Sequence, residues 1–582
     1  MLWSGACQCS KVIPDPMRTR LMTEKASMER GTWENAMKFV PRVRGAIGNH
    51  QAWPEVRGYV PLLAVLVLAG GIRLAYLLAA SRVPLFDHPR MDSVHYHEAG
   101  RAIAGGDLAL GHDIYHNSPL YSYLLGIVYS IAGDGPWPIR LVQLVMGLVT
   151  VALIHASAQR VYGPRWALAL ALCAGLYGPF IYFDGQLQAD GVAGLLQALL
   201  IFTALRACER PSPRRWLLAG ITLGLAVVAR PLALLYVVPL GVAAGRRSTS
   251  WRARVGVAIG LALPIAPVTL RNALVAGEAV LVTDSGGLNL FIGNGPGAMG
   301  TFRVPAGMQG ATHALGQIAA FRAVAEQAAG RRLTARQVDR YWIERTLRGI
   351  REHPLDWARV MGEKFWLFWN RRELPNIEDY EFNRHINPVL HMPFVQFGWL
   401  APVALLGSFA LLVRRNPAGR LVGGLNAIGC LGIIAVFVLA RYRIAVVPGL
   451  IIAAGAGART VVDLVQGRRW ILVGGVGLIV AGGVVLARAE KLPKPFDDEY
   501  FKLGYVYHVD GRFVEAERAY KAALALNQDN LSAHNNLASL YDTIGNIVAA
   551  KEHWLATQRI AISTGHPVEL ERARRQLLRE EP

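Results

Sequence analysis

Long blocks of apolar residues recur along most of this chain and limit what it can fold into. The blocks run to about 15 to 22 residues, close to the ~20 that cross a bilayer as an α-helix. Hydrophobic residues make up 53% of the 582 positions, charged residues only 18%, and the mean hydropathy is +0.29. A single water-soluble globule is therefore excluded, and we predict an all-α, polytopic helical membrane protein.

The formal net charge of +20 does not indicate a nucleic-acid partner, because most of the basic residues lie in short gaps between apolar blocks. Such gaps are typical of cytoplasmic loops, in which Lys and Arg are enriched. We therefore expect membrane lipids, and no nucleic acid, around this chain. The basic gaps contain Arg160 and Arg165; Arg206, Arg210, Arg214 and Arg215; Arg246, Arg247, Arg252 and Arg254; Arg414, Arg415 and Arg420; and Arg468 and Arg469.

Placing every basic gap on the cytoplasmic side predicts about eleven transmembrane helices. If the apolar run 119–133 crossed the membrane, every later basic gap would lie on the outer side. We therefore expect it to lie along the outer surface or to dip into the membrane and return. We take Arg230-Pro231 as a boundary between two spans, because proline interrupts a helix; one long kinked helix is the alternative. The predicted spans are 59–80, 139–158, 165–183, 188–206, 215–229, 231–245, 253–270, 396–413, 419–440, 444–465 and 470–487.

These spans divide the chain into five expected parts. Two of them are soluble domains on the outer side, and the first part is a cytoplasmic, disordered extension. The parts are residues 1–58 (the extension), 59–270 (a seven-span module with a first outer loop at 81–138), 271–395 (an extracytoplasmic loop domain of mixed secondary structure), 396–487 (four further spans) and 488–582 (an extracytoplasmic α-solenoid).

The solenoid is predicted from a 34-residue self-similarity within 497–564. Its pattern resembles the tetratricopeptide repeat, in which small residues let two helices pack closely and aromatic residues fill the space between them. A groove for a protein partner is one expected role, and a spacer or dimer surface is the other. The matching positions are Leu503, Tyr507, Gly511, Ala516 and Tyr520, followed by Leu537, Tyr541, Gly545, Ala550 and Trp554.

Short motifs between residues 59 and 487 occur in a distinctive order. An early Asp92 in the first outer loop is followed by a Pro-Leu-Tyr-x-Tyr-Leu-Leu segment at 119–125. Gly293-Asn294 lies in the large outer loop, Lys364-Phe-Trp-x-Phe-Trp comes near its end, and Arg441-Tyr-Arg443 opens a late span. This order resembles the GT-C fold superfamily of membrane glycosyltransferases, which includes protein O-mannosyltransferases and bacterial lipid A aminoarabinose transferases.

The resemblance implies an enzyme of the cell inner (cytoplasmic) membrane. It would transfer a hexosyl or pentosyl group from a polyprenyl-phosphate donor to a protein or lipid/glycan acceptor on the extracytoplasmic face. The catalytic first-loop Asp of this superfamily matches Asp92, although the neighbouring residue, often Glu in mannosyltransferases, is Ser93 here. A carboxylate near the membrane plane can act as a general base or orient the acceptor. A helix cap for 93–104 is the alternative role of Asp92.

Five further residues are candidates for substrate binding. Arg441 and Arg443 could hold the carrier phosphate, because guanidinium groups bind phosphate oxygens bidentately, and Lys364 is a similar candidate. Asp184 and Asp190 lie at the outer ends of spans, where acidic groups are usually functional, or else pair with Arg230. No motif selects the first-loop histidines as metal ligands. We therefore predict no certain cofactor and leave a divalent metal open.

Two other functions are weighed against the enzyme. A non-enzymatic scaffold would recruit envelope proteins through the C-terminal repeats, but eleven spans exceed what an anchor needs, and Asp92 would then tolerate alanine. A transporter would carry ionisable residues at mid-membrane and internal repeats of its spans. Here the acidic residues lie at the outer ends of the spans, which favours the glycosyltransferase.

Overall fold

The computed structural model describes residues 53–245, 251–302, 314–376, 379–413, 416–488 and 496–579. The extension predicted at 1–58 lies outside these residues up to position 52, as do Arg246, Arg247, Arg414 and Arg415. Residues 65–582 form one compact unit, and residues 1–64, of which 53–64 are described, form another. Within the described residues all elements are helices, and one isolated β-bridge pairs Tyr177 with Val395. This confirms the all-α prediction.

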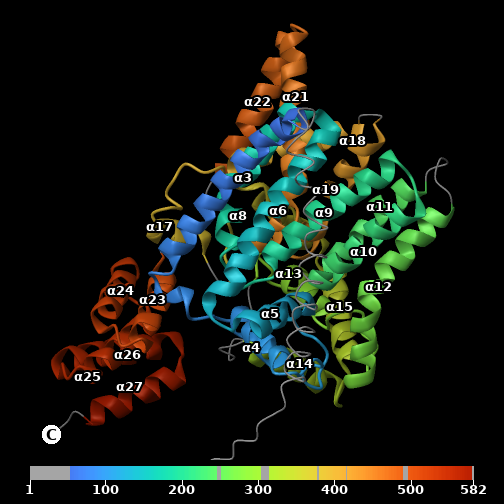
Figure 1. The fold of residues 1–582 in the computed structure, drawn as a ribbon. Coiled ribbons are helices and arrows are strands. Elements are labelled where there is room, and N and C mark those ends of the chain that lie inside the picture. Colours follow the sequence, from blue (N-terminus) through green and yellow to red (C-terminus); the bar gives the residue numbers. More distant parts are fainter. Residues whose placement is uncertain are drawn as a thin grey trace, which may run out of the picture. The chain divides into compact units, whose positions relative to one another are not determined.

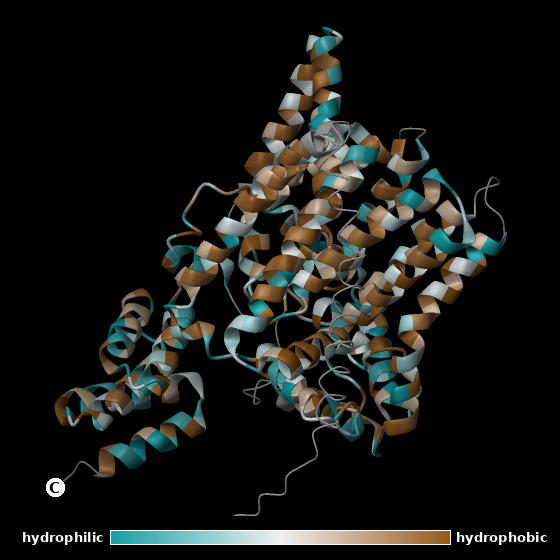
Figure 2. Ribbon diagram, viewed as in Figure 1, coloured by the Kyte–Doolittle hydropathy of each residue, from teal (hydrophilic) through white to brown (hydrophobic). Residues whose placement is uncertain are grey.

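Six of the described helices are long and apolar enough to cross a membrane. Figure 2 shows the long helices as mainly hydrophobic along their length. The count of eleven spans stays a prediction, because the other apolar segments are shorter. The six are α3 (Trp53–Ala80), α6 (Pro136–Tyr162), α9 (Asp190–Glu209), α12 (Trp251–Val275), α19 (Pro417–Val436) and α21 (Val447–Gln466); the shorter segments include α5 (Pro119–Ala132), α7 (Pro164–Gly175), α8 (Gly178–Phe183), α10 (Pro213–Ala229), α11 (Val237–Ala244), α18 (Phe397–Val413) and α22 (Trp470–Arg488).

The chain changes direction at Arg230-Pro231, as two separate crossings require. Helix α10 ends at Ala229, and a 3₁₀ turn, η2 (Pro231–Tyr236), leads into α11. Glycines pack α10 against α12 so closely that a Cβ on Gly220 would meet Val257 and Gly260, and one on Gly224 would meet Leu261 and Pro264. The contacts move toward the C-terminus on both helices at once, so α10 and α12 run parallel. The chain between them must therefore cross back to the side on which α10 begins. This favours two spans, α10 and the segment after Arg230, over one kinked helix.

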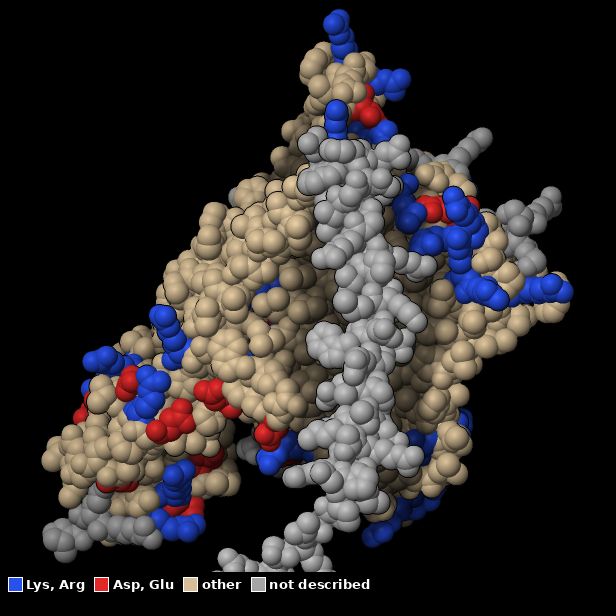
Figure 3. Space-filling model, in the orientation of Figure 1, with Lys and Arg blue, Asp and Glu red and all other residues tan. Residues whose placement is uncertain are grey.

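Two groups of contacts mark opposite ends of the helix bundle. At one end Arg160 pairs with Glu209 at 2.8 Å. At the other end Arg140 donates to the carbonyls of Gly185 (2.9 Å) and Phe86 (2.7 Å). In Figure 3 Lys and Arg gather near the upper ends of α9 and α10, above a broad band without charges. The predicted basic loops therefore share one end of the bundle where the structure describes them.

The apolar run at 119–132 forms a surface helix of the first loop. Helix α5 packs side by side with α4 (Asp92–Ala104) at one end of the bundle (Figure 1). Gly100 and Gly126 permit this contact, since a Cβ on Gly100 would meet Leu125 and one on Gly126 would meet Ile103. Because α4 and the start of α6 lie at this same end, α5 need not cross the membrane, as the charge pattern predicts.

The described elements of the large loop are all helices, joined by irregular segments. Apart from the bridge at Val395, the mixed secondary structure expected for 271–395 is not found among them. Its apolar centre contains Phe291, Phe321 and Trp342, packed against Phe437 from the end of α19. This contact holds the loop domain over the bundle end that carries α4 and α5. The elements are α13 (Gly286–Asn294), α14 (Ala314–Ala329), α15 (Ala335–Glu352), α16 (Pro354–Trp369) and α17 (Tyr380–Ile386), followed after α19 by the short α20 (Ala440–Ile444).

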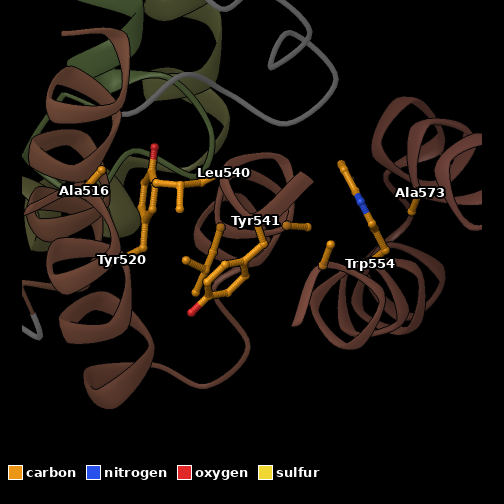
Figure 4. Close-up of a cluster of buried hydrophobic side chains, with 9 residues drawn as sticks. Ala516, Tyr520, Leu540, Tyr541, Trp554 and Ala573 are labelled. Atoms are coloured by element: carbon orange, nitrogen blue, oxygen red, sulfur yellow. The ribbon is translucent and has the colours of Figure 1, made fainter. Parts of the chain in front are cut away.

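The C-terminal residues form helical hairpins at the spacing that the 34-residue pattern predicts. Figure 4 shows Tyr520, Tyr541 and Trp554 filling the space between these helices. Gly504 lets α23 approach, since a Cβ there would lie 2.7 Å from the Tyr520 ring. The tetratricopeptide assignment itself stays a prediction. The helices are α23 (Asp497–Val509), α24 (Phe513–Leu526), α25 (Leu531–Thr543), α26 (Ile547–Thr564) and α27 (Pro567–Arg579).

Helices α23 and α24 also contact both outer loops. Leu503 and Ala519 form one apolar cluster with Phe382 of α17, and Leu85 of the 3₁₀ turn η1 (Pro84–Phe86) packs against it. Nearby, His88 Nε2 lies 2.6 Å from a carboxylate oxygen of Asp510. The C-terminal helices therefore lie on the same side of the bundle as the first loop, as the predicted topology requires.

Glycines between α18 and α21 lead to a first testable prediction. A Cβ on Gly407 would overlap the Ala453 carbonyl oxygen, and the neighbour is rigid backbone. We expect Gly407→Ala to lower the thermal stability of the purified protein by about 1–3 kcal/mol, the usual range for overpacking. Gly475→Ala in α22 is the control, because nothing lies within 4 Å of its added Cβ. Equal melting temperatures for the two variants would show that α18 and α21 do not pack this closely.

Candidate active site

A cavity of about 310 Å³ opens where the first loop, the large loop and the bundle meet. Its walls come from the start of α4, the loop before α5, η2, α13, α14, α19 and α20. Apolar residues of η2 and α19 line one part, and charged residues line another. Its polar lining includes Asp92, His116, Asn117, Arg230, Asn289 and Arg441.

Asp92 is the first residue of α4 and faces this cavity. The N-cap position is Met91, whose φ of 50° is unusual for a residue with a side chain. No side-chain hydrogen bond caps the helix, so the alternative role of Asp92 as a cap is not observed. Its carboxylate instead sits at the positive end of the helix dipole, which favours a negative charge.

Arg441 holds the Asp92 carboxylate. Its guanidinium donates a 2.8 Å hydrogen bond to Asp92 Oδ2, and both side chains are largely buried. Burial is the largest single effect and raises the pKa of Asp92, but the charges of Arg441 and Arg230 and the hydrogen bond from Arg441 together lower it below its ordinary value. Asp92 is therefore an anion at neutral pH and a weak base while it is paired.

Arg230 and Asp190 form a second ion pair beside the first. Asp190 is the first residue of α9, and its side chain is 1% exposed. The guanidinium groups of Arg230 and Arg441 lie 5.0 and 5.4 Å from the Tyr442 ring. Two arginines and two aspartates are thus assembled around one tyrosine. Asp190 makes the contact with Arg230 that was its alternative role, and it does not line the cavity.

Arg230 belongs to the cavity although it was not selected as a site residue from the sequence. The sequence carries a signal for it, because Arg230 stands at a break between two apolar segments, where an arginine is costly. Its pairing with Asp190 leaves part of the guanidinium in the cavity lining.

Arg443 does not line the cavity and contacts protein atoms instead. It pairs with Glu373 at 2.7 Å, and the two side chains are 1% and 2% exposed. It also donates to the carbonyls of Phe368 (3.2 Å) and Asn370 (2.8 Å). The predicted contact of Arg443 with a carrier phosphate does not fit this placement, and the residue ties the segment after α16 to α20.

Lys364 is fully buried and lies away from the cavity lining. Its ammonium donates a 2.8 Å hydrogen bond to Asn294 Oδ1, which also accepts one from Trp357 Nε1 at 3.2 Å. Burial lowers the pKa of Lys364 to about 7. The motifs around Asn294 and Lys364 therefore meet each other inside the loop domain, which corrects the predicted phosphate contact of this lysine.

Asp184 is also engaged within the bundle. Arg73 of α3 donates to its carboxylate at 2.8 Å and to the carbonyl of Gly175 at 3.1 Å. Gly147 leaves room for this pair, since a Cβ there would overlap the Asp184 carboxylate. Asp184 does not line the large cavity, so its placement supports a structural role rather than the predicted substrate contact.

A divalent metal stays untested. Among the described residues, no three His, Cys, Asp or Glu side chains are grouped in a way that could hold a metal ion.

Comparison with known proteins relates this architecture to a family. Residues 116–270 match the family model described as dolichyl-phosphate-mannose-protein mannosyltransferase. No curated protein matches the sequence. The matched range contains His116, Asp190 and Arg230, whereas Asp92 and Arg441 lie outside it.

Solved structures that match this chain include an oligosaccharyltransferase and ArnT. The Archaeoglobus fulgidus oligosaccharyltransferase in its apo form is 16% identical with a TM-score of 0.41, and the match covers 76% of this chain and 58% of that protein. The chain thus spans less than two thirds of the length of that relative. ArnT from Cupriavidus metallidurans in the apo state is 15% identical with a TM-score of 0.31, and the match covers 69% of this chain and 79% of ArnT. The family match at 116–270 confirms the resemblance of this chain to the membrane glycosyltransferases of the GT-C fold.

Proposed function

We propose that the chain transfers a sugar from a polyprenyl-phosphate carrier to a protein or lipid/glycan acceptor on the extracytoplasmic face of the cytoplasmic membrane. The observation that carries this proposal is the joint exposure of Asp92, Arg230 and Arg441 to one cavity. Two guanidinium groups suit a lipid phosphate, and a carboxylate beside them suits an acceptor.

The ion pairs suggest how the donor would bind. The carrier phosphate would bind Arg441 beside Asp92 and add a contact with Arg230. The Asp92 carboxylate, still paired with Arg441, would accept a hydrogen bond from the acceptor hydroxyl and align its oxygen with the anomeric carbon. A one-step displacement from the far side of the sugar would invert the configuration there. The apolar residues of η2 and α19 that line the cavity, Leu232 and Ile433 among them, suit an isoprenoid chain.

The extracytoplasmic face is supported by the charge distribution. The described basic loops lie at the bundle end opposite the cavity, and basic loops are typically cytoplasmic. The C-terminal helices lie on the cavity side, where they could hold a protein partner.

Among similar structures, ArnT is described bound to undecaprenyl phosphate, and the oligosaccharyltransferase AglB in complex with an inhibitory peptide and a dolichol-phosphate.

The proposal is tested by mass analysis of envelope glycoproteins and glycans in cells that lack the gene. We expect one sugar modification to disappear and to return with the wild-type gene. An unchanged glycan and glycoprotein profile would refute the proposal. Return of the modification with an Asp92→Ala gene would instead support the scaffold alternative, because a scaffold does not need this carboxylate.

Arg441→Gln is expected to weaken binding of undecaprenyl phosphate by roughly 10- to 100-fold, since a hydrogen bond to a charged group contributes about 1.5–3 kcal/mol. Binding can be measured by native mass spectrometry of the purified protein. The control is Arg348→Gln, which removes one exposed positive charge from α15. Unchanged binding by the Arg441 variant would show that the phosphate does not contact this guanidinium.

A further inference from the structure

His116 lies on the loop between α4 and α5 and faces the same cavity as Asp92 and Arg441. It also borders a second, small cavity of about 20 Å³ shared with Asp284, Asp339 and Trp342 of the large loop. The imidazole is thus placed at the junction between the first loop and the loop domain. None of the roles assigned above uses it.

Asp284, two residues before α13, lies beside this imidazole. His116 Nδ1 is 3.4 Å from Asp284 Oδ1, and the two side chains are 24% and 16% exposed. Both atoms are buried, and neither makes a hydrogen bond within the described residues. A carboxylate beside Nδ1 favours the tautomer with the proton on Nδ1, because its negative charge attracts that proton. The other ring nitrogen, Nε2, is then free to accept a proton.

Sugar transfer to a hydroxyl requires a destination for the hydroxyl proton. Asp92 is a poor destination, because Arg441 and Arg230 stabilise its anion. His116 lines the same cavity, and the positive charge that it would gain with the proton lies beside Asp284. The other charged and titratable groups around it are Asp92 and His95 on α4, Arg322 on α14, Asp339 on α15, and Arg230 and Arg441 across the cavity.

We propose that His116, held by Asp284, is the base that accepts the acceptor's proton, while Asp92 aligns the acceptor. This inference rests on the proposed function. In the step, the acceptor oxygen bonds to the anomeric carbon as the bond between that carbon and the phosphate oxygen breaks. The bonding pair stays with the phosphate, beside Arg441 and Arg230. The hydroxyl proton moves to His116 Nε2, and the imidazolium later returns it to water.

The test measures sugar transfer by purified protein in lipid nanodiscs. A lipid extract of parental cells supplies the donor, the envelope fraction of gene-deleted cells supplies the acceptor, and mass spectrometry follows the product. We expect His116→Gln to lower the rate by about 100-fold or more, within the range of general acid–base catalysis.

Two further variants separate proton transfer from a structural role. His116→Ala should regain part of its rate when imidazole is added, because the cavity can admit the small base. Asp284→Asn should lower the rate less, by about 10-fold, since the imidazole remains but loses its partner. His112→Gln, an exposed histidine of the same loop, should match the wild type.

A wild-type rate in His116→Gln would overturn the inference. So would a loss of undecaprenyl phosphate binding in that variant together with no rescue by imidazole, because the residue would then be structural. Failure of the proposed function looks different, since the wild-type protein itself would transfer no sugar.

Discussion

Replacing Asp92 by Asn is expected to lower sugar transfer by about 100-fold, the usual effect of displacing a reacting group by about 1 Å. The amide keeps the size of the side chain but carries no negative charge. It would neither form an ion pair with Arg441 nor hold the acceptor hydroxyl as a strong hydrogen-bond acceptor. The amount of folded protein in the membrane should stay close to wild type, because the amide oxygen can still accept the hydrogen bond from Arg441.

The measurement is the return of the sugar modification in gene-deleted cells that carry each variant at matched expression. Glu98→Gln is the control, since Glu98 is an exposed carboxylate on the same helix. Full activity of Asp92→Asn would remove Asp92 from the catalytic site.

Arg443→Leu is expected to cost about 3–5 kcal/mol of stability, the usual effect of removing one partner from a buried ion pair. Glu373 would be left without its partner at a site that is 2% exposed. Burial already raises the pKa of Glu373 to about 7 while the charge of Arg443 opposes the shift, so the unpaired carboxyl would take up a proton. Thermal unfolding of the purified protein measures the loss.

Two companion variants make this prediction specific. Adding Glu373→Leu to Arg443→Leu should restore part of the stability, because an apolar pair leaves no buried charge. Arg384→Leu breaks the half-exposed pair with Glu381, whose atoms are 3.6 Å apart, and should cost less than about 1 kcal/mol. Equal losses for Arg443→Leu and Arg384→Leu would contradict the structural role of Arg443.

Much of the architecture was predictable, because the bilayer sets the length of the apolar segments and the side on which positively charged loops lie. The surface position of α5 was predicted from the requirement that all basic loops share one side. The break at Arg230 was predicted from the proline after it. The helical loop domain was not predictable in this way, since the 271–395 segment contains no apolar run long enough to impose a membrane helix.

The candidate site was harder to predict from residue types. Arg441 and Arg443 were treated alike, yet residues two apart on a helix point about 200° away from each other. One guanidinium of α20 therefore faces the cavity and the other faces the protein interior. The same reasoning could have separated them beforehand. The contacts of Asp184 and Lys364 could not be predicted in this way, because their partners Arg73 and Asn294 are distant in sequence.

The contact of α23 and α24 with both outer loops has a mechanical consequence. Residue 85 lies seven positions before Asp92, and Asn376, which lines the cavity, lies six positions before Phe382. The packing of α23 and α24 against Leu85 and Phe382 therefore restrains both segments that lead to the cavity. A displacement of the C-terminal hairpins would therefore act on two chain segments that lead to the cavity lining.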